Sequence, residues 1–309
     1  SHSLLIMLVG SWLLSGCLAK RWKKDSVTRL QVGGFVAAIW ATHVLIDCFT
    51  VYGTSVLWPF SDQRVAFNNL FIIDPFYTLP MLLPLLVALF LRGKNQQILR
   101  RRLNSWGLVV SSAYVALSLV LKWMISSQFD ADLARRDVRY DRRMEAPTPF
   151  NILLWRSVVD RGDELWVGYR SVFDDRDASI RWTVFPKGQS ELSGLDNLRE
   201  VRRVQWFSDS WWIARSHAKG VWIGDLRFGE GRQWDRREGM LDVSPAFAWD
   251  VIPTADRDRL QPYYPGREDV AESLKRLAKR ITGDASEWES TPRLTGVTGR
   301  LPELLIVDD

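Results

Sequence analysis

Four apolar stretches near the start of this chain constrain its fold more than any other feature. They cover residues 3–19, 30–49, 75–91 and 107–126. Each is close to the roughly 20 residues that an α-helix needs to cross about 30 Å of hydrocarbon, although the first and third are at the short end. The first stretch also lacks the basic start and the small-residue cleavage site of a signal peptide. The sequence therefore predicts a bundle of four transmembrane helices in residues 1–126.

Basic residues between the apolar stretches predict how these helices are oriented. Residues 20–29 and 92–105 each hold five Lys or Arg, whereas residues 50–74 hold one, Arg64. Basic loops stay on the cytoplasmic side of a membrane. We therefore expect the first and third connections inside and the second outside, so that the fourth helix delivers the C-terminal part to the outer side. These loops account for the net charge of +5, and no basic and aromatic groove indicates a nucleic-acid partner.

The composition changes after the fourth apolar stretch. Residues 127–147 are expected to form a charged connector, with a helical continuation of the fourth segment as one option, before a Pro-rich break. Ten of the 16 Trp follow residue 150, in runs rich in β-branched and aromatic residues with turn residues between them. Residues 148–309 therefore predict an antiparallel β-rich domain with one late helix at residues 267–281. The expected fold class is a multi-domain membrane protein, with an α-helical transmembrane bundle followed by a β-rich (α+β) soluble domain.

Ionisable side chains within and beside the apolar stretches predict a functional site. His43 and Asp47 are four residues apart, so a helix places them one turn apart on the same face. Ionisable residues inside a membrane helix are costly and by default mark a functional site. The orientation derived from Lys and Arg alone also brings His2 and Asp74 to this outer level, and Arg64 lies in the outer loop between them.

This set of side chains predicts a divalent metal site. The predicted ligands are His2, His43, Asp47 and Asp74, whose nitrogen and oxygen atoms suit Zn²⁺, with Mn²⁺ as the alternative. Such an ion activates water and polarises a phosphoryl or carbonyl oxygen. Asp47 or Asp74 would act as ligand or base, and Arg64 would hold an anionic group. Other roles stay open, because Asp74 precedes a Pro and is equally suited to cap a helix, and Arg64 is also suited to the headgroup level.

Three parts of the chain resemble the bacterial inner-membrane metal-dependent hydrolase family, long described as a domain of unknown function. They are SHSLL at the start, the stretch THVLIDCFTVYGTSVLWPFSDQRVAFNNLFIIDP from residue 42, and runs of the β-rich part up to about residue 230. His2 and Ser3 match the His-Ser of the family's Thr-His-Ser signature, and His43 and Asp47 match its H-x-x-x-D. The more distant similarity of this family to the zinc-dependent phospholipase C and nuclease group implies phosphoester hydrolysis.

The resemblance also has implications for location and for completeness. A bacterial inner-membrane location, with the orientation derived above, places the β-rich domain in the periplasm. The family carries further Asp and His or Arg residues just upstream of its signature. Because this chain begins at Ser1 rather than Met, we expect missing upstream sequence, which would add to the site if those residues bind metal.

Two functional hypotheses follow from different classes. The leading one is a membrane hydrolase that acts at the outer face on a lipid-linked or phosphate-bearing substrate, with the bilayer as its partner and the β-rich domain covering the site. The rival is a non-catalytic membrane anchor whose Trp-rich domain binds a partner or an envelope polymer. His217 is interpreted as an ordinary surface residue, because one His without acidic neighbours makes no metal site.

Overall fold

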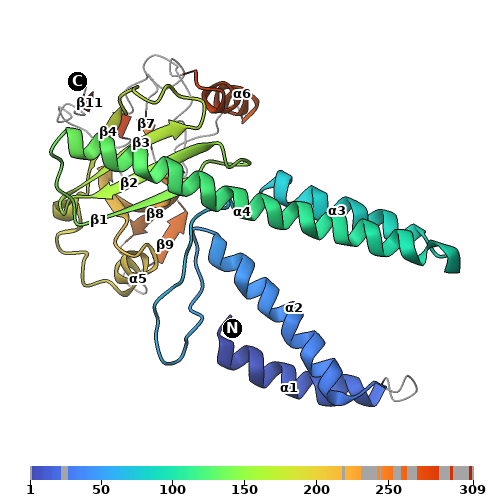
Figure 1. Ribbon diagram of the computed structural model, residues 1–309. Helices are drawn as coiled ribbons and strands as arrows, with labels where there is room; N and C mark the ends of the chain where they lie inside the picture. The colour runs from blue at the N-terminus through green and yellow to red at the C-terminus, as the bar shows by residue number, and fades with distance from the viewer. Residues whose placement is uncertain are drawn as a thin grey trace. The chain divides into compact units, whose positions relative to one another are not determined.

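The computed structural model describes residues 2–21, 27–217, 220–230, 242–243, 245–252, 259–262, 270–284, 293–294 and 306–307 (Figure 1). The chain divides into two compact units, Ser1–Ser111 and Ser112–Asp309, which are considered separately below. The described residues exclude Ser1, half of the predicted first basic loop and the first residues of the predicted late helix. Apolar helices come first and antiparallel sheets follow, so the predicted fold class is confirmed.

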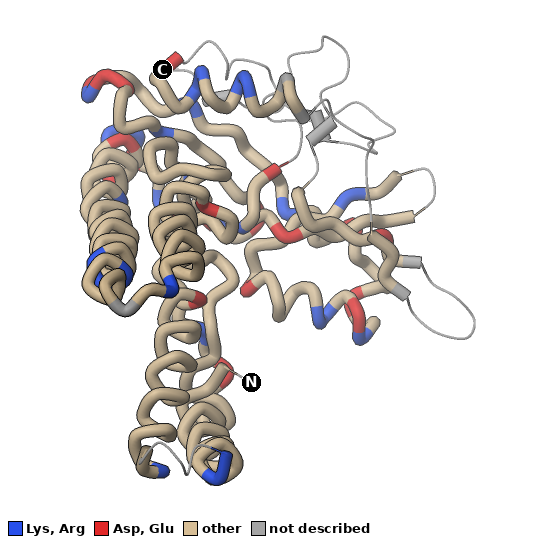
Figure 2. Tube along the Cα trace, turned by 90° about the vertical axis from the view of Figure 1, so that its right-hand side faces the viewer, with Lys and Arg blue, Asp and Glu red and all other residues tan. Residues whose placement is uncertain are grey.

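Apolar helices with largely exposed surfaces build the first unit. They are α1 (Leu4–Arg21), α2 (Arg29–Phe49) and α3 (Pro75–Phe90), followed by the short 3₁₀ helix η2 (Lys94–Gln96) and the start of α4 (Gln97–Arg135). Small residues let α1 and α2 approach closely, since a Cβ on Gly33 would lie 3.3 Å from the Cβ of Ser15. Lys and Arg lie at the end of this helix pair that is away from the N-terminus, as Figure 2 shows.

Three of the four predicted spans are long and apolar enough to cross a membrane: α1, α2 and α4. The exception is α3, whose 16 residues rise about 24 Å at 1.5 Å per residue, against roughly 30 Å of hydrocarbon. Pro84 has no N–H for the carbonyl of Pro80, so this carbonyl lacks its usual hydrogen bond within α3. Gly107 of α4 lies against this carbonyl, because a Cβ there would be only 2.7 Å from its oxygen.

The second unit begins earlier than the sequence predicted. Helix α4 runs without a break into the stretch predicted as a connector, as one of the two options had it, and β1 (Arg142–Pro147) occupies the end of that stretch. Ile125, Phe129 and Leu133 are almost fully buried at the four-residue spacing of one helix face, and the ring of Phe129 lies 5.7 Å from that of Trp182. Most charged side chains of this stretch form ion pairs within the fold. A high content of charged residues therefore did not mean that the stretch is a solvated linker.

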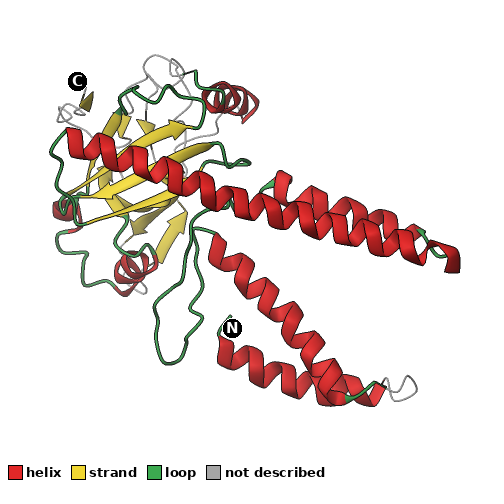
Figure 3. Cartoon of the chain, viewed as in Figure 1, coloured by secondary structure: helices red, strands yellow, loops and turns green. Residues whose placement is uncertain are grey.

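The described strands of this unit form two antiparallel sheets and a short parallel pair (Figure 3). The five-stranded sheet has the order β1-β2-β3-β4-β11 and includes β2 (Leu154–Asp160), β3 (Glu164–Ser171), β4 (Trp182–Pro186) and β11 (Ile306–Val307). The four-stranded sheet has the order β5-β6-β8-β9, with β5 (Trp212–His217), β6 (Gly220–Glu230), β8 (Pro245–Ile252) and β9 (Arg259–Pro262). The pair is β7 (Asp242–Val243) with β10 (Arg293–Leu294).

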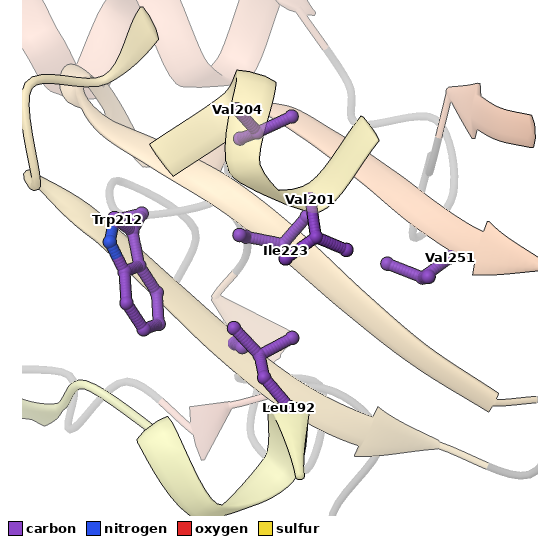
Figure 4. Packing of buried hydrophobic residues seen from close by; sticks show 7 residues of the cluster. Leu192, Val201, Val204, Trp212, Ile223 and Val251 are labelled. Carbon is purple, nitrogen blue, oxygen red and sulfur yellow. The ribbon is translucent and has the colours of Figure 1, made fainter. Parts of the chain in front are cut away.

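The four-stranded sheet has its own apolar core (Figure 4). The helix α5 (Arg199–Phe207) and the short helix η3 (Gln189–Leu192) supply apolar side chains to this core. The helix predicted near the end of the chain is α6 (Val270–Ile281). The core consists of Leu192, Val201, Val204, Trp212, Ala214, Ile223 and Val251. Val201 and Val204 are three residues apart, so they share the inner face of α5, which explains why this otherwise charged helix packs on the sheet.

A buried polar group connects the two sheets. Arg156 on β2 makes an ion pair with Glu230 on β6, and the Tyr169 hydroxyl donates to the same carboxylate over 2.8 Å. Burial and, secondarily, the charge of Glu230 raise the pKa of the Tyr169 phenol well above its ordinary value. Tyr169 therefore stays protonated and acts as a hydrogen-bond donor to the buried carboxylate.

Candidate metal centre

The first turn of α1 fixes the position of His2. The Ser3 hydroxyl accepts a hydrogen bond from the Ile6 N–H over 3.2 Å, so Ser3 caps the helix. The Leu4 N–H donates to the Val56 carbonyl over 2.9 Å, which ties the helix start to the loop between α2 and α3. Because His2 directly precedes this capped start, its side chain is held at the end of α1.

The C-terminal turn of α2 fixes Asp47. The Thr50 N–H and hydroxyl both donate to the Asp47 carbonyl, over 3.2 and 2.9 Å. The loop that follows α2 returns past the helix end and satisfies the carbonyls of the next two residues. The Phe67 N–H donates to the Cys48 carbonyl, and the Asn69 N–H donates to the Phe49 carbonyl. Helix ends leave carbonyls without partners inside the helix, so these bonds hold the last turn in place.

The loop between α2 and α3 is closed into a hairpin. Thr54 and Val65 exchange two backbone hydrogen bonds of 3.0 and 2.9 Å. Gly53 precedes this pair with φ +64°, and a Cβ there would lie 2.9 Å from the Cβ of Ala66. The position therefore requires glycine for its backbone conformation and for its close approach to the opposite strand. This hairpin presents the Val56 carbonyl that receives the start of α1.

The side chains of His2, His43 and Asp47 converge on one point. The two Nε2 atoms are 3.2 Å apart, and the Asp47 Oδ2 atom lies 3.5 Å from His2 Nε2 and 3.7 Å from His43 Nε2. The exposed fractions of these side chains are 44%, 60% and 36%, respectively. The sequence predicted the convergence of α1 with the i,i+4 pair of α2, and the structure brings all three residues together.

The three separations fit the edges of a metal tetrahedron. Zinc binds nitrogen and oxygen at about 2.0–2.2 Å, and the edge of a tetrahedron of that radius is roughly 3.3–3.6 Å. The observed separations are 3.2, 3.5 and 3.7 Å. Adjacent ligands of an octahedral ion with the same bond lengths would be closer, at roughly 2.8–3.1 Å.

The other two predicted site residues have different positions. Arg64 is half-buried and lines the same pocket as His2 and Asp47, a cavity of about 600 Å³. Asp74 is buried at the start of α3 and accepts hydrogen bonds from the Phe76 and Tyr77 N–H groups. It does not belong to the cluster that the described residues form, so its prediction as a third-helix ligand is replaced by the capping role.

Sequence reasoning missed several residues of the pocket. Tyr52 and Trp58 were not among the predicted site residues, but both line the cavity. Thr50, Thr54 and Ser55 add hydroxyl-bearing residues to its wall. The sequence did contain one signal for these five residues. They all follow Asp47 closely, in a loop that must return past the end of α2.

His217 differs from its interpretation as a surface residue without acidic neighbours. Its Nε2 atom lies 2.8 Å from Asp250 Oδ1, and its side chain is 11% exposed. The acidic partner is far away in the sequence and reaches His217 only through the pairing of β5 and β8 with β6. Among the residues that the structure describes, no third metal-ligating group joins this pair, in contrast to the cluster on α1 and α2.

Comparisons with known proteins cover the N-terminal part of the chain. Residues 1–126 match the sequence model of a family described as YdjM inner membrane protein. No curated protein and no solved structure gives a significant match. The family description names a location and no activity, so the resemblance to hydrolases and phospholipases stays a prediction. Together with the three helices that can cross a membrane, the match makes this a membrane protein whose first 126 residues are similar to a bacterial inner-membrane family.

Proposed function

We propose that this protein is a metal-dependent hydrolase that works at the outer face of the inner membrane on a phosphate-bearing or lipid-linked substrate. The observation that carries the proposal is the triangle of His2, His43 and Asp47. Structural zinc sites have four protein ligands, whereas catalytic sites have three and keep a fourth position for water or substrate. Three ligands with tetrahedral spacing, two of them lining a pocket, correspond to the catalytic pattern.

The roles of the chain's residues follow from this arrangement. A bound zinc ion would supply an activated water and polarise the phosphoryl oxygen. Arg64 lines the pocket beside the cluster and would hold the anionic group of the substrate. Asp47 offers one carboxylate oxygen to the ion, and its other oxygen would accept a proton from water. In the overall reaction the water oxygen joins phosphorus, the phosphorus–oxygen ester bond breaks, and the alcohol leaves with a proton.

Metal removal tests the proposal. The full chain, purified in detergent, should contain about one zinc per chain and should cleave at least one of a panel of phosphomonoesters, phosphodiesters, carboxylic esters and amides. Chelation should remove metal and turnover together, and added zinc should restore both, because the ion supplies the activated water. Metal content is measured by mass spectrometry of the elements. Turnover that persists in metal-free protein would contradict the proposal, and stable metal without any turnover would favour the non-catalytic anchor.

The proposed location of the β-rich unit needs a separate test, because α3 is short for a membrane span. Reporter fusions at residue 60 and after residue 309 should give the periplasmic signal, and a fusion at residue 97 should give the cytoplasmic one. The expectation rests on the basic residues of residues 20–29 and 92–105. Alkaline phosphatase activity and fluorescence of a cytoplasmic reporter provide the two readouts. A cytoplasmic signal after residue 309 would mean that α3 and α4 do not both cross the membrane.

A further inference from the structure

The tip of the hairpin between α2 and α3 exposes large apolar side chains. Leu57, Trp58 and Phe60 are 55%, 46% and 84% exposed. The tip is nevertheless ordered by local hydrogen bonds, since the Trp58 N–H donates to the Ser55 carbonyl and the Phe60 N–H donates to the Leu57 carbonyl. An ordered, apolar and aromatic tip in water is unfavourable, whereas Trp and its neighbours are common at the membrane–water interface.

The apolar surface of the tip is continuous with a surface that faces lipid. The Val56 carbonyl accepts the Leu4 N–H over 2.9 Å, so the tip begins directly beside the first turn of α1. On α1, Leu4, Leu5 and Leu8 are 43%, 42% and 61% exposed, as expected for a helix surrounded by lipid tails. Figure 1 shows the hairpin turning back toward the N-terminal end of α1. Both apolar surfaces are therefore expected to lie in the bilayer.

The pocket beside this tip has a lining of mixed chemistry. His2, Asp47 and Arg64 are its charged or metal-binding lining residues, whereas Ile6, Trp58 and Ile72 are its large apolar ones. Trp58 belongs to both the pocket and the exposed tip, so the pocket lining continues into the exposed apolar surface. The cavity of about 600 Å³ is within the size range of small-molecule sites. A ligand that matches this lining has both an anionic group and an apolar body.

We infer that the substrate is a phosphate-bearing bilayer lipid, which enters the pocket from the membrane past the hairpin tip. This inference rests on the proposed function for the metal and adds the substrate class and its route. Arg64, the only basic residue of residues 50–74, provides the positive charge for the phosphate, and the hydroxyl-bearing residues Thr54 and Ser55 line the same cavity. The lipid tails stay along the apolar lining residues and the tip. Hydrolysis uses one water, whose oxygen joins phosphorus while the glycerol oxygen leaves with a proton.

The first measurement concerns the position of the tip. Full-length protein in vesicles, with Cys17 and Cys48 replaced by Ala, receives a fluorophore at Phe60→Cys. Lipids that carry a nitroxide on their acyl chains should quench this fluorophore, because the side chain lies among the tails. The same fluorophore at Asp177→Cys, on an exposed loop of the second unit, provides the reference in water. Equal and weak quenching at both positions would overturn the inference.

The second measurement separates a lipid from a soluble phosphate with the same head group. Phosphatidic acid and phosphatidylglycerol in vesicles are compared with glycerol phosphate and glycerophosphoglycerol in solution. The lipids should be cleaved with a kcat/KM at least about tenfold higher, because each buried Leu or Phe contributes a factor of that order. A double variant, Leu57→Ser with Phe60→Ser, should lower kcat/KM for the lipids about tenfold or more. It should leave metal content and turnover of the soluble esters unchanged, because neither residue lines the pocket.

The two proposals fail in different ways in these experiments. Equal cleavage of lipid and soluble esters, unaffected by the double variant, would overturn the lipid route and leave a metal hydrolase of soluble phosphates. Cleavage of carboxylic esters or amides but of no phosphate would overturn the substrate class. Absence of metal would overturn the proposed function, and the nitroxide quenching would then still decide whether the tip lies in lipid.

Discussion

His43→Ala should leave the protein inserted and folded while removing its metal and its activity. The imidazole is 60% exposed, so its loss opens no cavity in a packed core. It does remove one of three ligands. Loss of an outer partner of a metal ligand already costs roughly 10- to 100-fold in affinity or activity, so loss of the ligand itself should cost more. Zinc content and turnover of the purified variant provide the measurement.

Two further variants make this experiment sharper. Asp47→Asn keeps the shape of the side chain but removes its charge, so it should lose metal in the same way. Thr42→Ala changes the residue beside His43 on the same helix, outside the cluster and the pocket, and should keep full metal and activity. If His43→Ala retained both, the pair on α2 would be a feature of helix packing, and the hydrolase would lose its main physical support.

Asp132→Ala should unfold the second unit or bring it close to unfolding. The carboxylate is almost fully buried at the end of α4 and accepts hydrogen bonds from the Ile180 N–H over 3.2 Å and the Trp182 indole over 2.9 Å. Arg135 and Arg136 also donate to it, each over 3.0 Å. Removing it leaves buried donors and a positive charge without their partner, which costs about 3–5 kcal/mol. Thermal unfolding of the full chain, followed by Trp fluorescence, should show a clearly lower transition temperature.

Asp130→Ala is the matched control on the same helix. Asp130 also pairs with an arginine, Arg143, but its side chain is 55% exposed. The Arg143 side chain is 9% exposed but keeps Glu145 and Ser126 as partners. Loss of the exposed Asp130 carboxylate should therefore cost less than loss of the buried Asp132 carboxylate, and this variant should unfold closer to the native temperature. Similar transition temperatures for Asp132→Ala and Asp130→Ala would show that α4 is not held to the five-stranded sheet through the buried carboxylate.

The sequence predicted the general fold well because its strongest signals are long and local. Runs of apolar residues indicated the positions of α1, α2 and α4, and runs rich in β-branched and aromatic residues, with turn residues between them, indicated the strands. The start of the second unit was missed for a physical reason. Asp130 and Arg143 look like linker charges when they are read one by one, and only the fold shows that they pair. Ion pairs between residues that are distant in the sequence cannot be recognised from the local amino-acid composition.

The candidate site was predictable in part for the same reason. His43 and Asp47 lie on one helix, so their spacing alone places them together. His2 could be added through the orientation of the helices, which charge counts predict. Asp74 shows where this reasoning ends, because a depth in the membrane does not specify a lateral position, and a carboxylate before a Pro serves equally well as a helix cap. The pocket walls depend on the path of the hairpin, which no periodicity encodes.

Gly53 has no side chain, yet the residue at this position strongly influences the distance between His2 and His43. Any larger residue there would push the two arms of the hairpin apart at Ala66. The displacement would pass through the Val56 carbonyl to the Leu4 N–H, and so to the residue that precedes the first turn of α1. The imidazole of His2 would then move away from His43 although no ligand had changed. The geometry of the cluster therefore depends on a glycine that does not belong to the cluster.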